Sequence, residues 1–91
     1  MTDPPRIRLY GTGSCSYCTA ARRLLQRKGL AFDDVAVDRD DEMRREIAEK
    51  SGRRTVPQIF IDNRPIGGFE ELVELDRSGE LDRMLGSGQV V

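Results

Sequence analysis

Apolar and polar residues alternate one by one over Arg6–Tyr10, which predicts a short β-strand near the start of the chain. After a turn of small residues the apolar positions recur at helical spacing, so a helix is predicted from Cys15 or Ser16 up to Gly29. The apolar stripe of this helix consists of Cys18, Ala21, Leu24 and Leu25. Residues 30–37 predict a second strand. A strand, a helix and a strand within about 33 residues normally form two parallel strands joined by a crossover.

The remainder of the chain predicts one more helix, two short strands and two further helices. Their predicted ranges are 41–50 for the helix, 58–61 and 65–66 for the strands, and 69–77 and 81–85 for the last two helices. We expect Asp38 or Asp40 to cap the first of these helices. Met43 and Ile47 are expected on its inward face. Because Pro65 lacks a backbone N–H, the second of these strands is expected at an edge of the sheet.

The resulting order β-α-β-α-β-β-α-α predicts an α/β domain with one mixed four-stranded sheet flanked by helices. A chain of 91 residues is long enough for a single domain and too short for two. We therefore expect one domain over residues 1–91, with an ordered core over 6–85 and a loose tail over 86–91.

Positive and negative charges nearly cancel, with 15 Lys and Arg against 16 Asp and Glu and a net charge of -1. Nucleic-acid-binding proteins usually carry a basic excess or stripe, so no nucleic-acid partner is expected. A basic stretch, which we interpret as a solvated helix face, consists of Arg22, Arg23, Arg27 and Lys28. The chain has neither an apolar run of the roughly 18 residues that a membrane span needs nor the apolar core of a signal peptide. We therefore expect a cytoplasmic protein without a membrane partner.

Histidine is absent, which excludes His-based acid–base catalysis and every His-ligated metal site. The two cysteines, Cys15 and Cys18, are separated by two residues. This spacing is typical of a redox pair and also of half a zinc site. A zinc site needs about two further ligands, which only a second copy of the chain could supply. A disulfide across so short a loop does little to stabilise a fold, so the redox interpretation is favoured.

Cys15 lies at the predicted start of a helix, where unpaired backbone N–H groups and the positive end of the helix dipole favour a thiolate. In Cys-x-x-Cys pairs at helix N-termini, the thiol pKa falls from about 8.5 to about 3.5–7.5. Cys18 lies one turn further along the same face, closer to the buried side and within reach of a disulfide with Cys15. We therefore expect Cys15 to attack a substrate and Cys18 to resolve the resulting mixed disulfide.

Three motifs resemble those of dithiol glutaredoxins of the bacterial type, in the same order and spacing. They are Tyr10-x-x-x-x-Cys15-Ser16-Tyr17-Cys18, Thr55-Val56-Pro57-Gln58-Ile59-Phe60-Ile61 and Ile66-Gly67-Gly68. The similarity extends from Arg6 to Leu85. Thioredoxins normally have Trp before a Cys-Gly-Pro-Cys motif, whereas this chain has Ser14 there and no Trp at all. The resemblance implies a thioredoxin-like fold and glutathione as the reductant.

The same resemblance implies a glutathione site formed by the second and third motifs. Pro57 is expected in the cis form, next to a Val56 backbone that pairs with the cysteinyl backbone of glutathione. Thr55 precedes this pair, and Tyr17 is expected beside the ligand. The γ-glutamyl end of glutathione is held in similar proteins by backbone N–H groups and an acidic side chain. The corresponding residues here are Gly68, Phe69, Glu70 and Glu71.

The chain departs from the family pattern at three positions. Thr12 stands where the family commonly has a Lys that meets the glycine carboxylate of glutathione, and the loss of that charge would leave the pKa of Cys15 less depressed. Arg44 is our candidate replacement, and a solvated Arg44 is an equal alternative. Phe69 stands where a Cys or a small residue is common, so we expect its larger side chain to narrow the groove that binds glutathione. Ser16 stands where the common motif has Pro. In this the Cys-Ser-Tyr-Cys site resembles family members that hold a [2Fe–2S] cluster between two protomers.

Residues and resemblance together predict a glutathione-dependent thiol-disulfide oxidoreductase, acting as a monomer. It reduces disulfide-containing or glutathionylated client proteins through Cys15 and Cys18. The alternative is a dimer bridged by a [2Fe–2S] cluster, with Cys15 of each chain and two glutathione thiols as ligands and a role in cluster storage or transfer. A monomer then has no metal site. A third hypothesis, an electron donor reduced by thioredoxin reductase, is disfavoured by the Gly67-Gly68 turn and the two acids after it, which favour glutathione.

Overall fold

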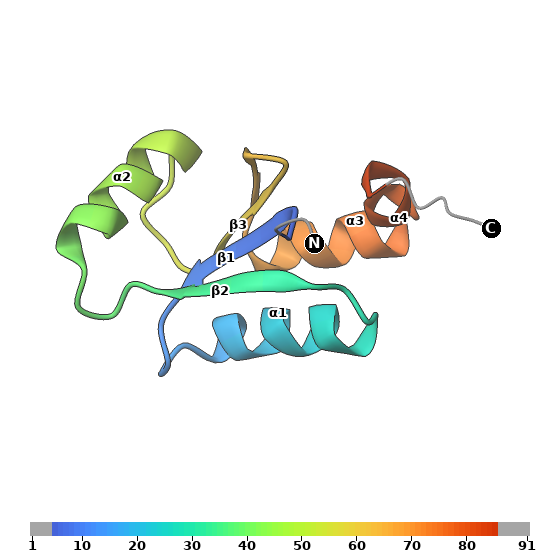
Figure 1. The fold of residues 1–91 in the computed structure, drawn as a ribbon, viewed down its shortest axis with the longest axis horizontal. Coiled ribbons are helices and arrows are strands. Elements are labelled where there is room, and N and C mark those ends of the chain that lie inside the picture. The colour runs from blue at the N-terminus through green and yellow to red at the C-terminus, as the bar shows by residue number, and fades with distance from the viewer. Residues whose placement is uncertain (1–4, 86–91) are drawn as a thin grey trace, which may run out of the picture.

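The computed structural model describes residues 5–85, which form one mixed sheet and its flanking helices (Figure 1). The strands are β1 (Ile7–Gly11), β2 (Phe32–Ala36), β3 (Gln58–Ile61) and β4 (Arg64–Gly67). The helices are α1 (Ser16–Arg27), α2 (Asp41–Ser51), α3 (Phe69–Arg77) and α4 (Glu80–Met84). This order confirms the predicted α/β class, while the tail expected over 86–91 lies outside the described residues. Within residues 5–85, no helix is long and apolar enough to cross a membrane.

β1 lies inside the sheet, whose strand order is β2-β1-β3-β4. It pairs parallel with β2 and antiparallel with β3, and β4 completes the sheet through an antiparallel pair with β3. Since Tyr10 pairs with Gln58 and Ile7 pairs with Ile61, the end of β1 lies beside the start of β3. We call the end of the sheet at which β1 leads to the cysteines the dithiol end. The opposite end, where Arg6 precedes β1, is the Arg6 end.

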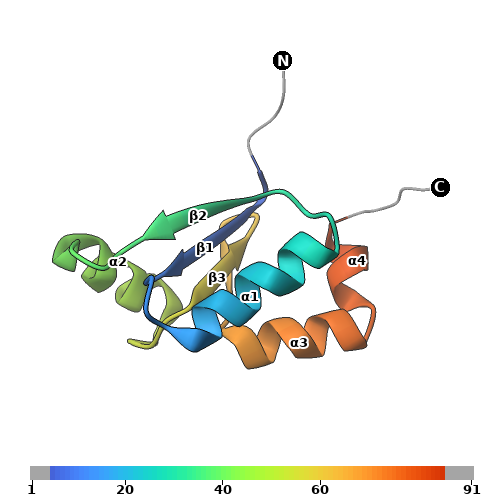
Figure 2. The same ribbon diagram turned by 90° about the horizontal axis from the view of Figure 1, so that it is seen from below.

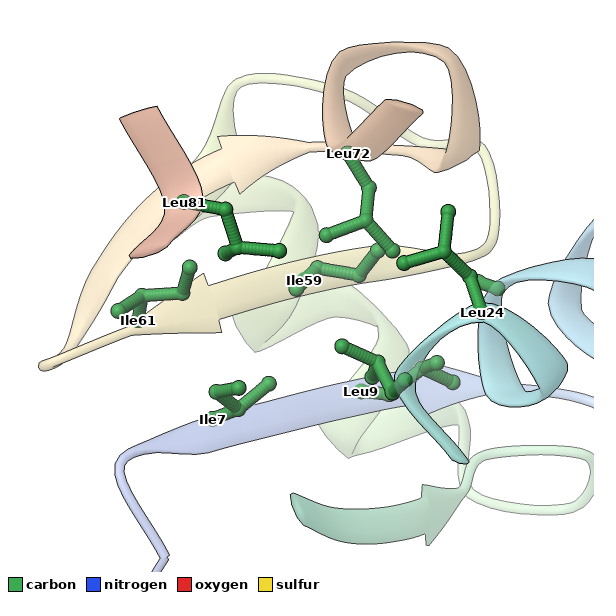
Figure 3. Packing of buried hydrophobic residues seen from close by; sticks show 9 residues of the cluster. Ile7, Leu9, Leu24, Ile59, Ile61, Leu72 and Leu81 are labelled. Atoms are coloured by element: carbon green, nitrogen blue, oxygen red, sulfur yellow. The ribbon is translucent and has the colours of Figure 1, made fainter. Parts of the chain in front are cut away.

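One face of the sheet holds the larger part of the core, packed against α1, α3 and α4. Figure 2 shows α1 and α3 side by side in front of the strands. Figure 3 shows Leu72 of α3 pointing toward Ile59 of β3, with Leu24 of α1 beside it. The buried members of this cluster are Ile7, Leu9, Ala21, Leu24, Leu25, Ile59, Ile61, Leu72 and Leu81. The predicted apolar stripe of α1 is confirmed, because all of its residues are buried.

The opposite face of the sheet carries a smaller cluster beneath α2. It consists of Tyr10, Val37 and Phe60 together with Ile47, the buried residue of α2. The rings of Tyr10 and Phe60 meet edge to face with centroids 5.4 Å apart. Asp40 caps the start of α2, since its carboxylate accepts a backbone N–H at 3.0 Å. Because Ile47 is its one buried residue, α2 contributes little to the core and leaves most of its surface exposed.

The second strand is shorter than the sequence predicts, because α1 ends in a hydrogen-bonded turn that includes the residues before the strand. Gly29 adopts a left-handed φ of 71°, and its N–H donates to the carbonyl oxygen of Gln26 at 3.0 Å. The N–H of Leu30 donates to the carbonyl oxygen of Leu25, also at 3.0 Å. These two bonds satisfy the last carbonyls of the helix in the pattern of a glycine-terminated helix end. Pairing with β1 therefore begins at Phe32.

The basic stretch of α1 is a solvated face only in part. Nζ of Lys28 lies 2.7 Å from Oδ1 of Asp76, which ties α1 to α3. Nε of Arg22 lies 2.8 Å from Oδ2 of Asp34, which ties α1 to β2. The interpretation is therefore wrong for Arg22 and Lys28, because the tertiary fold brings carboxylates of neighbouring elements to both side chains.

Candidate functional site

Cys15 occupies the N-cap of α1, after the loop that leaves β1 at the dithiol end. Its backbone is extended (φ -87°, ψ 119°), and its Sγ accepts a hydrogen bond of 3.3 Å from the backbone N–H of Cys18. The side chain is half-buried, and Sγ lies 3.6 Å from the carbonyl oxygen of Val56. The sulfur is thus held at the positive end of the helix dipole, where a thiolate is stabilised.

Cys18 lies one turn into α1 and is fully buried. It packs against Gly11, where an added Cβ would lie 2.7 Å from the Sγ of Cys18 and 3.2 Å from a methyl group of Leu9. The absence of a side chain at the last residue of β1 therefore leaves the space that the second sulfur fills. Both cysteines are free thiols, and Cys18 is the more buried of the two.

The surroundings shift the pKa values of the two thiols in opposite directions. For Cys15, burial by itself raises the pKa, but hydrogen bonds from the Cys18 thiol and from backbone N–H groups, with the charge of Arg22, outweigh burial and lower it. For Cys18, burial and the hydrogen bond to Cys15 raise the pKa to about 11. Near neutral pH, the ionised fraction is therefore larger for Cys15 than for Cys18.

Arg22 supplies a positive charge beside the dithiol. Its guanidinium pairs with Asp34, and its Nη2 donates to the carbonyl oxygen of Thr12 at 3.3 Å. The side chain is 18% exposed, so the charge is held against the loop before the cysteines. Asp38 also holds this loop, because its carboxylate accepts the backbone N–H of Gly13 at 3.1 Å. Although Thr12 stands where similar proteins have a Lys, Arg22 supplies a cation at this end of the sheet. Sequence reasoning missed this role of Arg22, because the contact with Asp34 on β2 places its guanidinium there.

A groove of about 270 Å³ opens next to Cys15, whose Sγ lies close to Val56 in the groove wall. The groove is lined by Tyr17, Arg53, Thr55, Val56, Pro57, Gly68, Phe69, Glu70 and Glu71. All residues expected to contact glutathione lie in this lining except Arg44. The Val56–Pro57 peptide bond is cis, as the resemblance implies. The fold thus brings the second and third sequence motifs together beside the first.

One wall of the groove is aromatic. The rings of Tyr17 and Phe69 lie with centroids 6.2 Å apart and planes inclined by 35°. Tyr17 is 58% exposed, and it is the large apolar side chain that residues 5–85 leave most open to solvent. Phe69, which stands where similar proteins have a Cys or a small residue, therefore adds apolar surface next to the exposed ring. Aromatic surface of this kind beside a thiol suits the aliphatic and sulfur-bearing parts of a peptide ligand.

The start of α3 forms a polar part of the groove. Oε1 of Glu71 accepts a hydrogen bond of 2.7 Å from the N–H of Gly68 and lies 3.2 Å from Nη1 of Arg53. The Gly68 bond and the Arg53 charge hold the pKa of Glu71 below its usual value. The Gly68 N–H, which we expected to bind a ligand carboxylate, is therefore used by Glu71 in this structure. The N–H groups of Phe69 and Glu70 precede the first helical hydrogen bond of α3 and have no acceptor within the helix.

Two charged side chains, Glu71 and Arg44, differ from the sequence-based assignment. Glu70 lines the groove and makes no hydrogen bond or ion pair with any other described residue, whereas Glu71 makes both. Arg44 does not line the groove and lies instead at a neighbouring hollow. The cation in the groove is Arg53, which sequence reasoning missed. Its position two residues before Thr55 is the available signal, because alternate residues of an extended segment share a side.

Within residues 5–85, no group of three or more Cys, Asp or Glu side chains could hold a metal ion. Cys15 and Cys18 therefore find no further ligands among the described residues of the same chain. The hypothesis of half a zinc site, like that of a cluster-bridged dimer, requires a second copy of the protein.

Comparison with known proteins identifies consistent relatives. The family model described as Glutaredoxin matches residues 7–66. A glutaredoxin from Pseudomonas aeruginosa is 45% identical over 83 residues, which cover 91% of this chain and 99% of that protein. Glutaredoxin 3 from Escherichia coli is 43% identical over 79 residues, covering 87% of this chain and 95% of that protein. A crystal structure of a buckwheat glutaredoxin–glutathione complex is similar with a TM-score of 0.85 at 27% identity, covering 91% of this chain and 78% of that chain.

Proposed function

The chain belongs to the glutaredoxin family, whose members are thiol-disulfide oxidoreductases, and we propose that it uses glutathione to reduce protein–glutathione mixed disulfides and protein disulfides. The observation that carries this proposal is the difference between the two thiols. Cys15 is half-buried beside the groove and has a lowered pKa, whereas Cys18 is buried and has a pKa of about 11. Because the thiolate is the nucleophile in thiol–disulfide exchange, Cys15 is the attacking residue.

On a protein–glutathione mixed disulfide, the Cys15 thiolate attacks the glutathione sulfur. A bond between Cys15 and glutathione forms as the bond to the client sulfur breaks, and the client leaves as a thiolate that takes up a proton. A second glutathione, as its thiolate, then attacks the glutathione sulfur on Cys15, which releases glutathione disulfide and restores the Cys15 thiolate. One mixed disulfide and one glutathione thus become one client thiol and one glutathione disulfide.

On a protein disulfide, the attack of Cys15 leaves the client joined to the enzyme, and Cys18 resolves this bond. The Cys15 thiol group is itself one of the causes that raise the pKa of Cys18. Once Cys15 is part of a mixed disulfide it no longer carries a negative charge, so the pKa of Cys18 falls and its thiolate forms more readily. That thiolate attacks the sulfur of Cys15, the client leaves as a dithiol, and two glutathione molecules then reduce the Cys15–Cys18 disulfide.

The groove offers a partner for each charged group of glutathione, which has two carboxylates and one ammonium. The N–H groups of Phe69 and Glu70 suit the γ-glutamyl carboxylate, and the Glu70 carboxylate suits the adjacent ammonium. Arg53 suits the second carboxylate, and the backbone of Val56 suits the cysteinyl backbone. The likeness to a buckwheat glutaredoxin–glutathione complex supports glutathione as the ligand.

The test is steady-state reduction of a glutathionylated peptide by glutathione, NADPH and glutathione reductase, with the wild type and two single variants. Cys15→Ser should abolish turnover, because it removes the nucleophile. Cys18→Ser should retain turnover of the glutathionylated peptide and lose reduction of a protein disulfide. Comparable turnover by Cys15→Ser would contradict the proposed mechanism.

A second candidate function is a [2Fe–2S] cluster bridging two copies of the chain, with Cys15 of each copy and two glutathione thiols as the four ligands. The accessibility of Cys15 at the open groove favours it, as does Ser16, which is exposed at the first position of α1 and keeps the N–H that a Pro there would lack. Protein purified without oxygen should then be a dimer with visible absorbance that Cys15→Ser abolishes. A colourless monomer after reconstitution with iron, sulfide and glutathione would contradict this role.

A further inference from the structure

A second hollow, of about 710 Å³, lies at the exposed side of α2 and the segment that follows it. It is lined by Arg44, Arg45, Ala48, Glu49, Gly52 and Arg54. We call it the arginine hollow. Nothing in the proposed reaction uses it.

The sequence forms this hollow through the way α2 ends. Ile47 directs one side of α2 toward the sheet, so Arg44 and Arg45 are exposed on the helix surface. Gly52 ends the helix with a left-handed φ of 77°, a conformation that glycine adopts without steric penalty. The chain reverses there and brings Arg54 to the same hollow as the two helix arginines.

The arginines of the hollow have unused charges. Side chains of Arg44, Arg45 and Arg54 make no hydrogen bond or ion pair with any other residue of the described range 5–85. Arg53, by contrast, pairs with Glu71 in the glutathione groove. The lining holds one acid, Glu49, against the three arginines, although the whole chain has a net charge of -1. The hollow is therefore a local positive surface on a protein that is slightly negative overall.

The arginine hollow adjoins the groove in which the chemistry takes place. Arg54 directly precedes Thr55, which lines the groove, so the two adjacent residues line the two different depressions. A small recess between them is lined by residues of both, among them Arg44, Arg54 and Val56. Val56 is also the residue whose carbonyl oxygen lies 3.6 Å from the Sγ of Cys15. A polypeptide whose sulfur reaches Cys15 therefore has neighbouring residues within range of the arginines.

From this arrangement we infer that the arginine hollow binds acidic segments of client proteins, close in sequence to the cysteine that is reduced. The inference rests on the proposed function, because the client is the substrate whose sulfur enters the groove. Three guanidiniums with a concave arrangement match clustered carboxylates in charge and in hydrogen-bond donors. A nucleic acid fits less well, since no aromatic side chain lines the hollow for base stacking. Clients with acidic residues beside the modified cysteine are thus preferred over neutral and basic ones.

The test compares glutathionylated peptides that share one cysteine and differ in its neighbours, which are glutamates, glutamines or lysines. The variants are Arg45→Glu, Arg54→Glu and the double variant, and the matched control is Arg77→Glu. Arg77 is exposed at the far end of α3 and makes no ion pair within the described residues, so it receives the same change of charge away from the hollow. kcat/KM is measured for each pair at low and at high salt.

We expect the wild type to prefer the acidic peptide, and each hollow variant to lower kcat/KM for that peptide by about threefold to tenfold. The same variants should raise kcat/KM for the basic peptide and leave kcat/KM for the neutral peptide unchanged. High salt should remove the differences in kcat/KM between the peptides. Arg77→Glu should leave the preference as it is.

Equal losses on all three peptides, or no change on any, would overturn the inference, since the arginines would then act on glutathione or on nothing. Two competitors, a single-stranded oligonucleotide and a free acidic peptide, are also compared for inhibition of the turnover of the glutathionylated acidic peptide. Inhibition by the oligonucleotide at the lower concentration would assign the hollow to nucleic acid and would also overturn the inference. Turnover of the neutral peptide by the wild type reports separately on the proposed function, so the two failures are distinguishable.

Discussion

The two ends of the sheet differ in how their polar groups find partners. At the Arg6 end, Nε and Nη2 of Arg6 donate to the two carboxylate oxygens of Asp62 at 2.7 and 2.6 Å. Nη1 and Nη2 also donate to the backbone carbonyl oxygens of Leu85 and Met84, each at 2.8 Å. One side chain thus joins the start of β1, the turn after β3 and the end of α4.

At the dithiol end, several polar groups have no partner within the described residues. The carboxylate of Glu70 and the N–H groups at the start of α3 face the groove, and Arg44 and Arg54 face the arginine hollow. Cys15 is supported by hydrogen bonds and yet remains accessible. Polar groups that hold the fold are paired within the chain, whereas polar groups left unpaired around a depression are available to a ligand. The following variants test this difference.

Leu72→Ala should have the largest effect, because it damages the core that both ends share. Leu72 is fully buried against Ile59, and truncation of a buried leucine costs about 2–5 kcal/mol of unfolding free energy. Urea unfolding measures this loss. Glu74→Ala, an exposed change on the same helix, is the control and should stay within about 0.5 kcal/mol of the wild type. A shift no larger than that of the control would contradict the packing described for this face.

Gly11→Ala should damage the dithiol end specifically. The added methyl group would meet the sulfur of Cys18 at 2.7 Å, and such overpacking costs about 1–3 kcal/mol. Because Cys18 is displaced, reduction of a protein disulfide should slow more than reduction of a glutathionylated peptide. Gly13→Ala is the matched control, since a Cβ there would meet nothing closer than Asp38 at 3.9 Å. Equal behaviour of the two alanine variants would show that the space beside Cys18 has no role.

Arg22→Met should raise the pKa of Cys15, because the charge of Arg22 is one of the influences that lower it. Activity rises with pH as the Cys15 thiolate forms, so the variant should need a higher pH and lose more activity in acid than in alkaline buffer. Thiolate absorbance in the ultraviolet measures the same pKa directly. Arg22→Lys keeps the charge and should stay close to the wild type. An unchanged pKa of Cys15 in Arg22→Met would show that the charge of Arg22 does not stabilise the Cys15 thiolate.

Arg6→Gln should have the smallest effect, a lower unfolding midpoint with unchanged turnover. It removes the contacts to Asp62 and to the end of α4, which are exposed to solvent and far from the groove. Arg8→Gln is the matched control, because Arg8 makes a single, longer ion pair of 3.7 Å with Asp33. Thermal unfolding and the peptide assay measure both properties. A loss of turnover in Arg6→Gln at a temperature where it is folded would contradict the separation of the two ends.

The order of the elements and the position of the dithiol could be predicted from the sequence, because both depend on local pattern. The helical stripe that ends in Leu25 fixes which side of α1 is buried, and a cysteine before that helix becomes its N-cap. Hydrophobic periodicity of this kind is a property of neighbouring residues and needs no knowledge of the tertiary fold.

The charged groups of the site could not be predicted in the same way. Arg22 was expected on a solvated face, and it contacts Thr12 because Asp34 on β2 holds it there. Glu71 and Glu70 are adjacent acids in one sequence motif, but Glu71 alone caps its helix and pairs with Arg53. Long charged side chains can reach several partners, so their roles follow from which segments the fold brings near them.

The two thiols are chemically unequal, and their alkylation rates test this difference most directly. The reduced protein is treated with iodoacetamide over a range of pH, and peptide mapping follows Cys15 and Cys18 separately. We predict that Cys15 reacts with the pH profile of a thiol whose pKa lies below that of a free cysteine. As long as Cys15 is unmodified, Cys18 should stay unreacted until the pH approaches its pKa of about 11, so the initial rates are compared. Alkylation of Cys18 at neutral pH as fast as that of Cys15 would contradict the account.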